Sequence, residues 1–141
     1  MVGVLKISEA ASIALHTVAL LASNPSRPVS AREAASELHV SEAHLSKVLQ
    51  RLGKVGLVKS LRGPGGGFML ARPPEDIVLL EVYEAIDGPL VPHDCLFDEK
   101  TCHGRTCVLG GLLDSVSEQV RNHLSNTRLT DLNSLYVMQD A

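Results

Sequence analysis

Three cysteines are the residues of this chain whose types and spacing could do chemistry. Cys95, Cys102 and Cys107 are its only cysteines, and they fall within thirteen consecutive residues. Clustered thiolates are ligands for soft metals, so zinc and an iron–sulfur cluster are the occupants to consider. His103 or His93 could add a nitrogen ligand to either. An odd number of cysteines argues against a framework of disulfides.

The spacing of the cysteines separates these two kinds of metal site. They follow the pattern C-x6-C-x4-C, which is wider than the short steps between the cysteines of structural zinc sites. Wider spacing suits an iron–sulfur cluster, a larger object held by thiolates and at times by one other ligand. The sequence therefore favours an iron–sulfur cluster over zinc. A bare-thiol redox sensor and a site that has lost its metal remain open.

Charge is distributed unevenly over the elements that must position this loop. Residues 1–72 carry nine Lys and Arg against four acids, a net charge of +5, whereas residues 73–141 carry four against twelve, a net charge of −8. This asymmetry predicts that only the first half faces a polyanion such as DNA. No apolar run is long enough to span a membrane and no secretory signal is recognisable, so we expect a cytoplasmic protein with no membrane partner.

Hydrophobic spacing in the first half predicts a helix-turn-helix. Apolar residues at steps of three and four predict a helix over Leu5–Ala22. Ser30 and Glu33 form a capping box at the start of a second helix, and Ser41 is placed to cap a third that runs to Gly56. Two short helices joined by a tight turn, the second basic on its outer face, are typical of this motif.

A β-hairpin, or wing, is predicted next. Residues 57–62 alternate apolar and polar side chains, the glycine-rich run 63–67 makes the turn, and residues 68–71 return. The run is not a nucleotide-binding P-loop, because it joins two strands and lacks the G-x-x-x-x-G-K-[ST] pattern. The chain also lacks the signature of a nucleophile with its base. We therefore expect a DNA-binding protein and not an enzyme.

Side chains of the third helix and the wing have the types that contact DNA. Polar ones could reach base edges in the major groove, and basic ones would neutralise phosphates. Helix starts expose N–H groups that can hold phosphate, and an arginine on a thin turn suits a narrow minor groove. The candidate contacts are Ser30 and Ser41 at helix starts, His44 and Ser46 toward bases, Lys47, Arg51 and Lys54 toward phosphates, and Arg62, Gly63, Pro64 and Gly65 on the wing.

The second half is predicted to hold the cysteines between two helices. Asp76 is placed to cap a helix that runs to Ile86, and the cysteine loop follows. A long helix then runs from Val108 to about Leu124. Its apolar face is long for a helix near the end of a small domain, so we expect it to pack partly on another subunit. A short helix is predicted over 129–135.

These elements divide the chain by task. We expect residues 1–75 to form the winged helix-turn-helix region that contacts DNA. We expect residues 76–141 to hold the cysteine loop and the dimerisation helices, packed with the first helix as one compact unit.

A resemblance to a known family rests on the third helix and the wing together. The Rrf-type family of bacterial repressors has a winged-helix segment similar to the run SEAHLSKVLQRLGKVGLVKSLRGPGGGFMLARP, with RGPGGG as its most specific part. The later helix IVLLEVYEAIDGPL and the cysteines follow in the family's order, over about residues 3–135. The resemblance implies a mainly α fold with a wing and a long C-terminal dimerisation helix. It also implies a homodimer that reads a two-fold operator in double-stranded DNA, with Arg62 and Pro64 in the minor groove.

The same resemblance implies a cofactor. Family members hold a 2Fe–2S or a 4Fe–4S cluster on three cysteines of this loop and one other ligand, and we favour 2Fe–2S here. The middle cysteine is shifted by one residue, and Gly110 replaces the histidine that completes the site in cluster-biogenesis regulators. Glu9 matches the first-helix carboxylate that nitric-oxide-sensing members take from the partner subunit. His103, His93 and His16 are rivals for this position.

The expected function is transcriptional repression controlled by the cluster, with nitric oxide, redox state or iron supply as the signal. The alternative is a repressor of the same fold controlled by its thiols, or by a partner protein, without a metal. The iron and sulfide content of the protein would separate the two.

Overall fold

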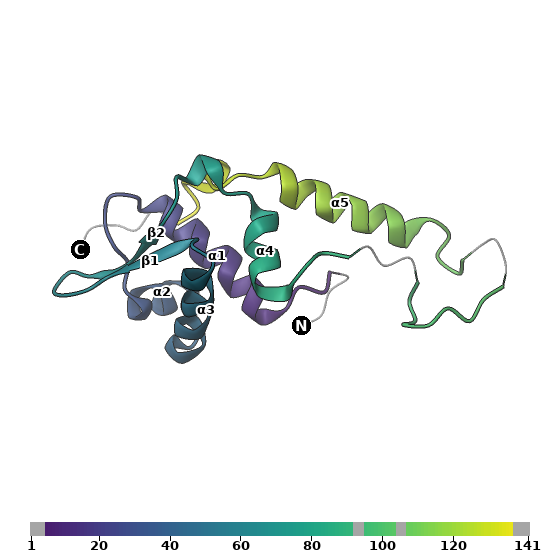
Figure 1. Ribbon diagram of the computed structural model, residues 1–141, viewed down its shortest axis with the longest axis horizontal. Coiled ribbons are helices and arrows are strands. Elements are labelled where there is room, and N and C mark those ends of the chain that lie inside the picture. Colours follow the sequence, from purple (N-terminus) through teal and green to yellow (C-terminus); the bar gives the residue numbers. More distant parts are fainter. Residues whose placement is uncertain (1–4, 92–94, 104–106, 137–141) are drawn as a thin grey trace.

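Helices dominate the structure, and one antiparallel hairpin lies among them (Figure 1). The computed structural model describes residues 5–91, 95–103 and 107–136. The elements in these ranges are α1 (Glu9–Ser23), α2 (Ala31–Leu38), α3 (Glu42–Lys54), β1 (Val58–Leu61), β2 (Gly67–Leu70), η1 (Pro74–Asp76), α4 (Leu79–Asp87), α5 (Leu112–Asn126) and η2 (Leu129–Leu132). The predicted fold class, mainly α with a β-hairpin wing, is confirmed.

The first helix begins later than predicted. The Ser8 hydroxyl accepts a hydrogen bond from the Ala11 N–H at 3.0 Å, so Ser8 is the N-cap and α1 starts at Glu9 rather than at Leu5. Hydrophobic spacing marks the face that is buried, whereas the cap decides where the helix begins. The other end was predicted within one residue.

Serine caps set the starts of α2 and α3, as predicted. The Ser30 hydroxyl accepts from the Glu33 N–H and the Ser41 hydroxyl from the His44 N–H, both at 3.0 Å. The other half of the predicted capping box does not form: the Glu33 carboxylate accepts a hydrogen bond from Arg27 at 3.1 Å instead of reaching back to the Ser30 N–H. The helix α3 ends at Lys54, two residues before the predicted Gly56, and its inner face is buried as predicted: Leu45, Val48, Leu49 and Leu52.

The wing is held to the start of α2. Strands β1 and β2 pair in register from Val58 with Leu70 to Leu61 with Gly67. A further bridge joins Phe68 to Val29, just before α2. A Cβ at Gly67 would lie 2.6 Å from the Val29 carbonyl carbon and oxygen, so this close approach requires glycine.

The prediction that Asp76 caps the next helix is wrong. Asp76 ends the short η1 turn, and α4 begins at Leu79. Between them, the Leu129 N–H donates to the Ile77 carbonyl and the Leu79 N–H to the Thr127 carbonyl, both at 3.0 Å. This pairing holds residues 77 and 78 extended, so a helix cannot run through them.

The last helix also begins later than predicted, at Leu112 rather than at Val108. The Gly110 N–H donates to the Cys107 carbonyl at 2.9 Å and closes a turn. Two adjacent glycines, Gly110 and Gly111, resist continuation of a helix. After α5, the predicted helix over 129–135 is the shorter 3-10 turn η2.

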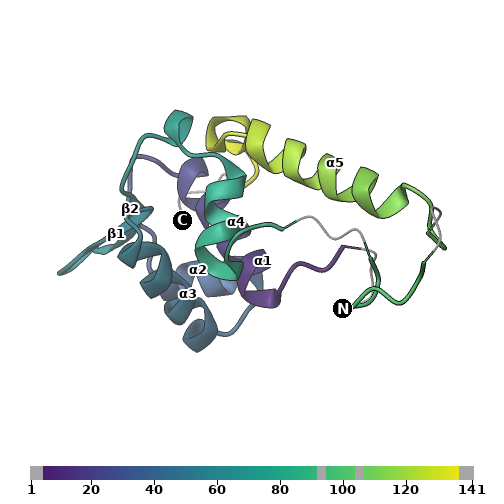
Figure 2. The same cartoon turned by 45° about the vertical axis from the view of Figure 1, so that its right-hand side comes forward.

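The core lies where α1 to α4 meet, and α5 reaches away from it. Buried apolar side chains of α1, α2, α3 and α4 form one cluster, to which α5 adds only Leu124 among the described residues. Helix α5 extends outward, so the wing and the cysteine loop lie at opposite ends of the long axis (Figures 1 and 2). Within the described ranges, no helix is long and apolar enough to cross a membrane.

Candidate nucleic-acid interface and cysteine loop

The outer face of α3 carries the side chains predicted to read DNA. His44 and Ser46 are half-buried, and Lys47 is exposed. His44 faces the start of α1, where its Nδ1 lies 3.8 Å from the Glu9 Oε1. A candidate base-reading residue and the candidate fourth ligand of a cluster are therefore neighbours, which the sequence did not indicate.

Arg51 has a protein partner on this face. Its Nη2 donates a hydrogen bond to the carbonyl of Ile86, in the last turn of α4. A guanidinium has five N–H donors, so this contact is compatible with the predicted phosphate contact. It adds a structural role that sequence reasoning missed.

The wing presents its tip to solvent. Arg62, Gly63, Pro64 and Gly65 are all exposed. The Gly66 N–H donates to the Gly63 carbonyl at 2.9 Å, and positive φ values at Gly63 and Gly65 turn the chain. Arg62 therefore stands beside a thin, mostly glycine turn, as a minor-groove contact requires.

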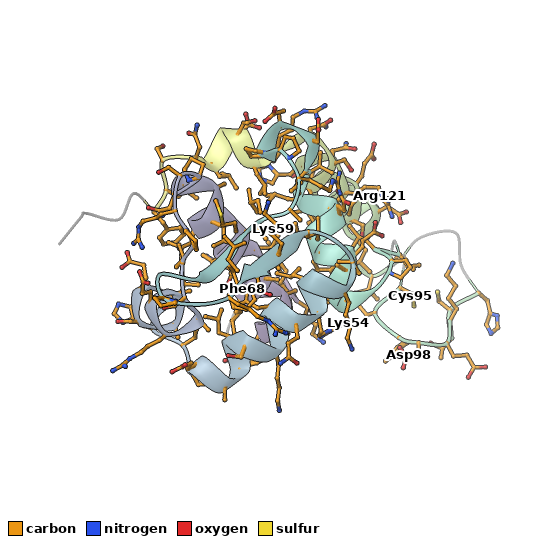
Figure 3. The ribbon with its side chains drawn as sticks, turned by 60° about the vertical axis from the view of Figure 1, so that its left-hand side comes forward. Lys54, Lys59, Phe68, Cys95, Asp98 and Arg121 are labelled. Carbon is orange, nitrogen blue, oxygen red and sulfur yellow. The ribbon has the colours of Figure 1, made fainter. Side chains whose placement is uncertain are left out.

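Two lysines add to the basic surface, and one of them, Lys54, is a predicted phosphate contact. Lys59 is exposed on β1 and Lys54 at the end of α3, and Figure 3 shows both, with the cysteine loop to one side of them. Lys59 was not among the predicted contacts, although strand alternation places it on the outside. Arg72, by contrast, is held by Glu81 and by the Asp76 carbonyl.

Ser30 and Ser41, the predicted phosphate contacts at helix starts, are also the N-caps of their own helices. The hydroxyls of Ser30 and Ser41 each accept from a backbone N–H of their own helix. Ser41 is exposed and Ser30 is half-buried. What these positions offer a phosphate is therefore the positive end of the helix and its first N–H groups.

The cysteine loop lies apart from the core. All three cysteines are free thiols, with Cys102 exposed and the other two half-buried. In the described part of the chain, no three His, Cys, Asp or Glu side chains come together as a metal-sized group. The loop is also rich in exposed apolar surface, since Leu96 and Phe97 are each 66% exposed.

The start of the loop is fixed to two helices. The Leu90 N–H donates to the Glu84 carboxylate at 2.7 Å. Arg121 of α5 donates to the carbonyl of the same Leu90. The loop therefore leaves the body from a point held by both α4 and α5.

The candidate fourth ligands lie in different surroundings. Glu9 heads α1 with 79% of its side chain exposed. His16 lies about two turns further along α1, where its Nδ1 is 2.6 Å from the Ser12 carbonyl oxygen and its ring packs edge-on against Tyr136. His103 is exposed on the loop, whereas His93 lies outside the described residues.

A helix-turn-helix with a basic outer face, followed by a wing with an arginine at its tip, defines a winged-helix DNA-binding regulator of transcription. The sequence profile of the Rrf2 family, described as an iron-dependent transcriptional regulator, matches residues 7–134. The chain belongs to this family.

Individual proteins agree with this assignment. The chain is 31% identical over 129 residues to the helix-turn-helix transcriptional regulator BadM of Rhodopseudomonas palustris, over 91% of this chain and 81% of BadM. Its fold is similar to that of CymR, the global cysteine regulator of B. subtilis, with a TM-score of 0.77, 30% identity and coverage of 93% and 98%. It is also similar to the IscR of T. potens, with a TM-score of 0.71, 25% identity and coverage of 98% and 95%. These proteins are transcriptional regulators and not enzymes, as predicted for this chain.

Proposed function

We propose that this chain is a dimeric transcriptional repressor whose hold on a two-fold DNA operator depends on an iron–sulfur cluster in the cysteine loop. The observation that carries this proposal is the placement of all three thiols, each free of a disulfide, on one loop of a chain from an iron-dependent regulator family. The signal is nitric oxide, redox state or the supply of iron, acting in the cytoplasm.

The donor set fits such a group. Cys95, Cys102 and Cys107 would supply three soft thiolates, and Glu9 of the partner subunit would supply the fourth ligand from the start of its α1. When bound, a cluster would supply a centre that reacts with oxidants and with nitric oxide. A 2Fe–2S cluster is favoured and a 4Fe–4S cluster is the second candidate. Among the described residues of one chain, the three thiols do not form a metal-sized group with one another. Binding a cluster would therefore require the loop to draw its cysteines together, beside α1 of the partner subunit.

A second copy of the chain is the partner that α5 requires. Its apolar residues Leu113, Val116 and Val120 are only half-buried, and Leu112 is 55% exposed. Covering this face with its own copy would remove apolar surface from water, at roughly 25 cal/mol per Å². A two-fold pair of reading heads then matches a two-fold operator.

The two halves of the chain divide the work. In residues 1–75, α3 enters the major groove, with His44 and Ser46 toward bases and Lys47 and Arg51 toward phosphates. Ser30 and Ser41 place helix starts near the backbone, and Arg62, Gly63, Pro64 and Gly65 follow the minor groove. Residues 76–141 hold the cluster loop and the dimer contact.

Anaerobic purification tests the cofactor. The protein should be brown and contain both iron and acid-labile sulfide. A duplex selected from a random pool by the purified protein supplies the operator probe. Nitric oxide should bleach the colour and change affinity for this duplex together, as measured by fluorescence anisotropy. Colourless, iron-free protein from anaerobic cells would contradict the proposal, as would bleaching without any change in DNA affinity.

Salt dependence tests the wing. Arg62→Ala should weaken operator binding and flatten the slope of log affinity against log salt by about one phosphate contact or less. Arg62→Lys is the control, because it keeps the charge and loses the planar fork that fits a narrow groove. It should retain the slope. Unchanged affinity in Arg62→Ala would remove the wing from the interface.

A repressor of the same fold controlled by its thiols is the second candidate. The fold similarity to CymR, a cysteine regulator, favours it, together with the exposed thiol of Cys102. In this case the protein would be iron-free after anaerobic purification. Its DNA affinity would then change on thiol oxidation or on addition of a partner protein.

A further inference from the structure

The last turn of α4 is where the sensing and reading parts of the molecule touch. On one side, Arg51 of α3 donates a hydrogen bond to the Ile86 carbonyl. On the other, the Ser8 hydroxyl donates to the Asp87 Oδ1 at 2.5 Å, and the Ser8 N–H lies 3.4 Å from the Asp87 Oδ2. The recognition helix and the start of α1 are thus bound to adjacent residues.

The Arg51 contact has a clear physical basis. The last four carbonyls of a helix have no partner within it, and the C-terminus carries partial negative charge. A guanidinium from a neighbouring helix satisfies such a carbonyl and complements that charge. The Ile86 side chain is buried in the core, so the carbonyl that Arg51 holds belongs to a well-packed turn.

The Ser8 contact ties a second helix to the same turn. Ser8 is the N-cap of α1, so its hydroxyl accepts from Ala11 and donates to Asp87. Glu9 follows directly and lies 3.8 Å from His44 of α3. Glu9, the candidate cluster ligand, therefore directly follows the residue that is hydrogen-bonded to the last turn of α4.

The α4 turn leads straight into the cysteine loop. Helix α4 ends at Asp87 with Gly88 as its C-cap, and the Gly88 N–H donates to the Glu84 carbonyl at 3.0 Å. Two residues on, Leu90 is held by Glu84 and by Arg121. A displacement of the loop would therefore reach Ile86, the residue contacted by Arg51, through a short and hydrogen-bonded stretch of chain.

Arg51 shares one face of α3 with the candidate DNA contacts. His44, Lys47 and Arg51 are three and four residues apart, so they form a single stripe. A shift of the Ile86 carbonyl would therefore act on the same stripe that is predicted to face DNA. If Arg51 contacted only solvent or phosphate, no hydrogen bond would connect it to α4, and a shift of α4 would not reach it in this way.

We propose that Arg51 is a positioning residue that transmits the state of the cysteine loop to α3 through the Ile86 carbonyl, with Ser8 and Asp87 tying α1 into the same relay. This inference deepens the proposed function and rests on it for the identity of the signal. The hydrogen bonds of Arg51 with Ile86 and of Ser8 with Asp87 form within a single chain and involve no cofactor.

The first test needs no cofactor. In iron-free protein, Arg51→Met keeps the aliphatic stem and removes the hydrogen bond. It should increase hydrogen–deuterium exchange in the peptide that spans 84–90, where the Gly88 amide reports on the α4 turn. The matched control, Lys54→Met, removes one charge from the exposed end of the same helix and should leave this peptide unchanged. Equal exchange in wild type and Arg51→Met would overturn the relay.

The second test measures coupling. Wild-type affinity for the selected duplex is compared between protein reconstituted with iron and sulfide and the same protein bleached by nitric oxide. A ratio within the ~5–150-fold range usual for allosteric pairs is expected. Arg51→Met should reduce this ratio below about twofold, whereas Lys54→Met should weaken both states equally and keep the ratio. Arg51→Lys, which can still donate to the carbonyl, should restore part of it.

The outcomes distinguish the relay from the sensing function. A wild-type ratio of one would overturn the proposed sensing function, while increased exchange in Arg51→Met would still support the contact. A large ratio that persists in a folded Arg51→Met variant would overturn the relay and leave the sensing function intact. Circular dichroism melting of each variant confirms that the comparison is between folded proteins.

Discussion

The DNA-reading part and the cysteine loop differ in how far their own chain completes them. In the first, α2 and α3 are capped by serines, the wing is bridged to Val29, and the inner face of α3 is buried. In the second, large apolar side chains stand in solvent: Val91, Leu96, Phe97, Val108 and Leu112. The first part exposes fewer such side chains, Val55 and Leu61 among its described residues, and the second leaves more of its apolar surface uncovered by the described chain.

This contrast has an energetic meaning. Full burial of a leucine or phenylalanine side chain contributes about 1.5–3 kcal/mol relative to leaving it exposed. The apolar face of α3 is buried and contributes this stabilisation, whereas the apolar side chains of the loop and of the start of α5 are exposed and do not. The stability of the second region should therefore depend on a second copy and on the cofactor, and the stability of the first should not.

The largest expected effect tests this contrast directly. Leu49→Ala leaves a cavity in the core and should lower the free energy of unfolding by about 2–5 kcal/mol. Leu112→Ala removes the same atoms from a side chain that is 55% exposed. At dilutions where the chain is monomeric, it should cost less than about 0.5 kcal/mol. Urea unfolding followed by circular dichroism measures both.

Protein concentration sharpens the same comparison. As a dimer forms, wild type should gain stability that Leu112→Ala fails to gain, whereas Leu49→Ala should gain as much as wild type. Light scattering gives the mass at each concentration. Similar costs for the two variants at low concentration would mean that the two regions do not differ as described.

The second effect concerns the wing. Gly67→Ala places a Cβ 2.6 Å from the backbone of Val29. We expect a loss of about 1–3 kcal/mol in stability, because the wing base must move from α2. Operator affinity should fall as well. Gly53→Ala is the matched control, since the nearest atom to its Cβ, the Val58 carbonyl oxygen, is 3.8 Å away. It should be neutral or stabilising, and a larger loss there than at Gly67 would contradict the role of the close approach.

Sequence predicted the elements whose signals are local. Serine caps, alternating strand residues and the leucine stripe of α3 act within one turn or one hairpin. The start of α4 was wrong because Ile77 is held extended by Leu129, a partner 52 positions later in the chain. The start of α5 was predicted wrongly because the hydrophobic periodicity extends back through Gly110 and Gly111, whereas the helical backbone begins only after them, at Leu112.

The candidate site was predictable as a set of residue types and not as a set of contacts. Charge and spacing indicated Arg51 as a basic residue on the outer face of α3. Its bond to Ile86 depends on how α3 packs against α4, which no local pattern encodes. The approach of Glu9 to His44 has the same origin. The roles of these residues in DNA and cluster binding stay predictions that the experiments above address.

A smaller effect is expected in the turn between α2 and α3. His39 has φ 55°, the left-handed conformation that a residue with a Cβ adopts at a cost. His39→Gly should raise stability by about 0.5–1 kcal/mol, because glycine is favoured at this end of a helix. Thermal unfolding measures the gain. His39→Ala is the contrasting variant, since it keeps the Cβ and should give no gain; equal effects would show that the backbone conformation is not the cause.

The smallest effect lies at the seam between the two regions. Burial raises the pKa of Tyr83 above its ordinary value of 10.0, and the carboxylates of Asp87 and Glu84 raise it further. In a Tyr136→Phe background, Tyr83 is the only tyrosine, so absorbance at the phenolate band should give a midpoint above 10.0. Because the folded state holds this proton more tightly, the associated stability is present below pH 10.0 and is lost as the pH rises through the folded pKa. Asp87→Asn should lower the midpoint, since it removes a negative charge beside the phenol. A midpoint at or below 10.0 in the folded protein would mean that this side of α4 is more open to water than the core against which it packs.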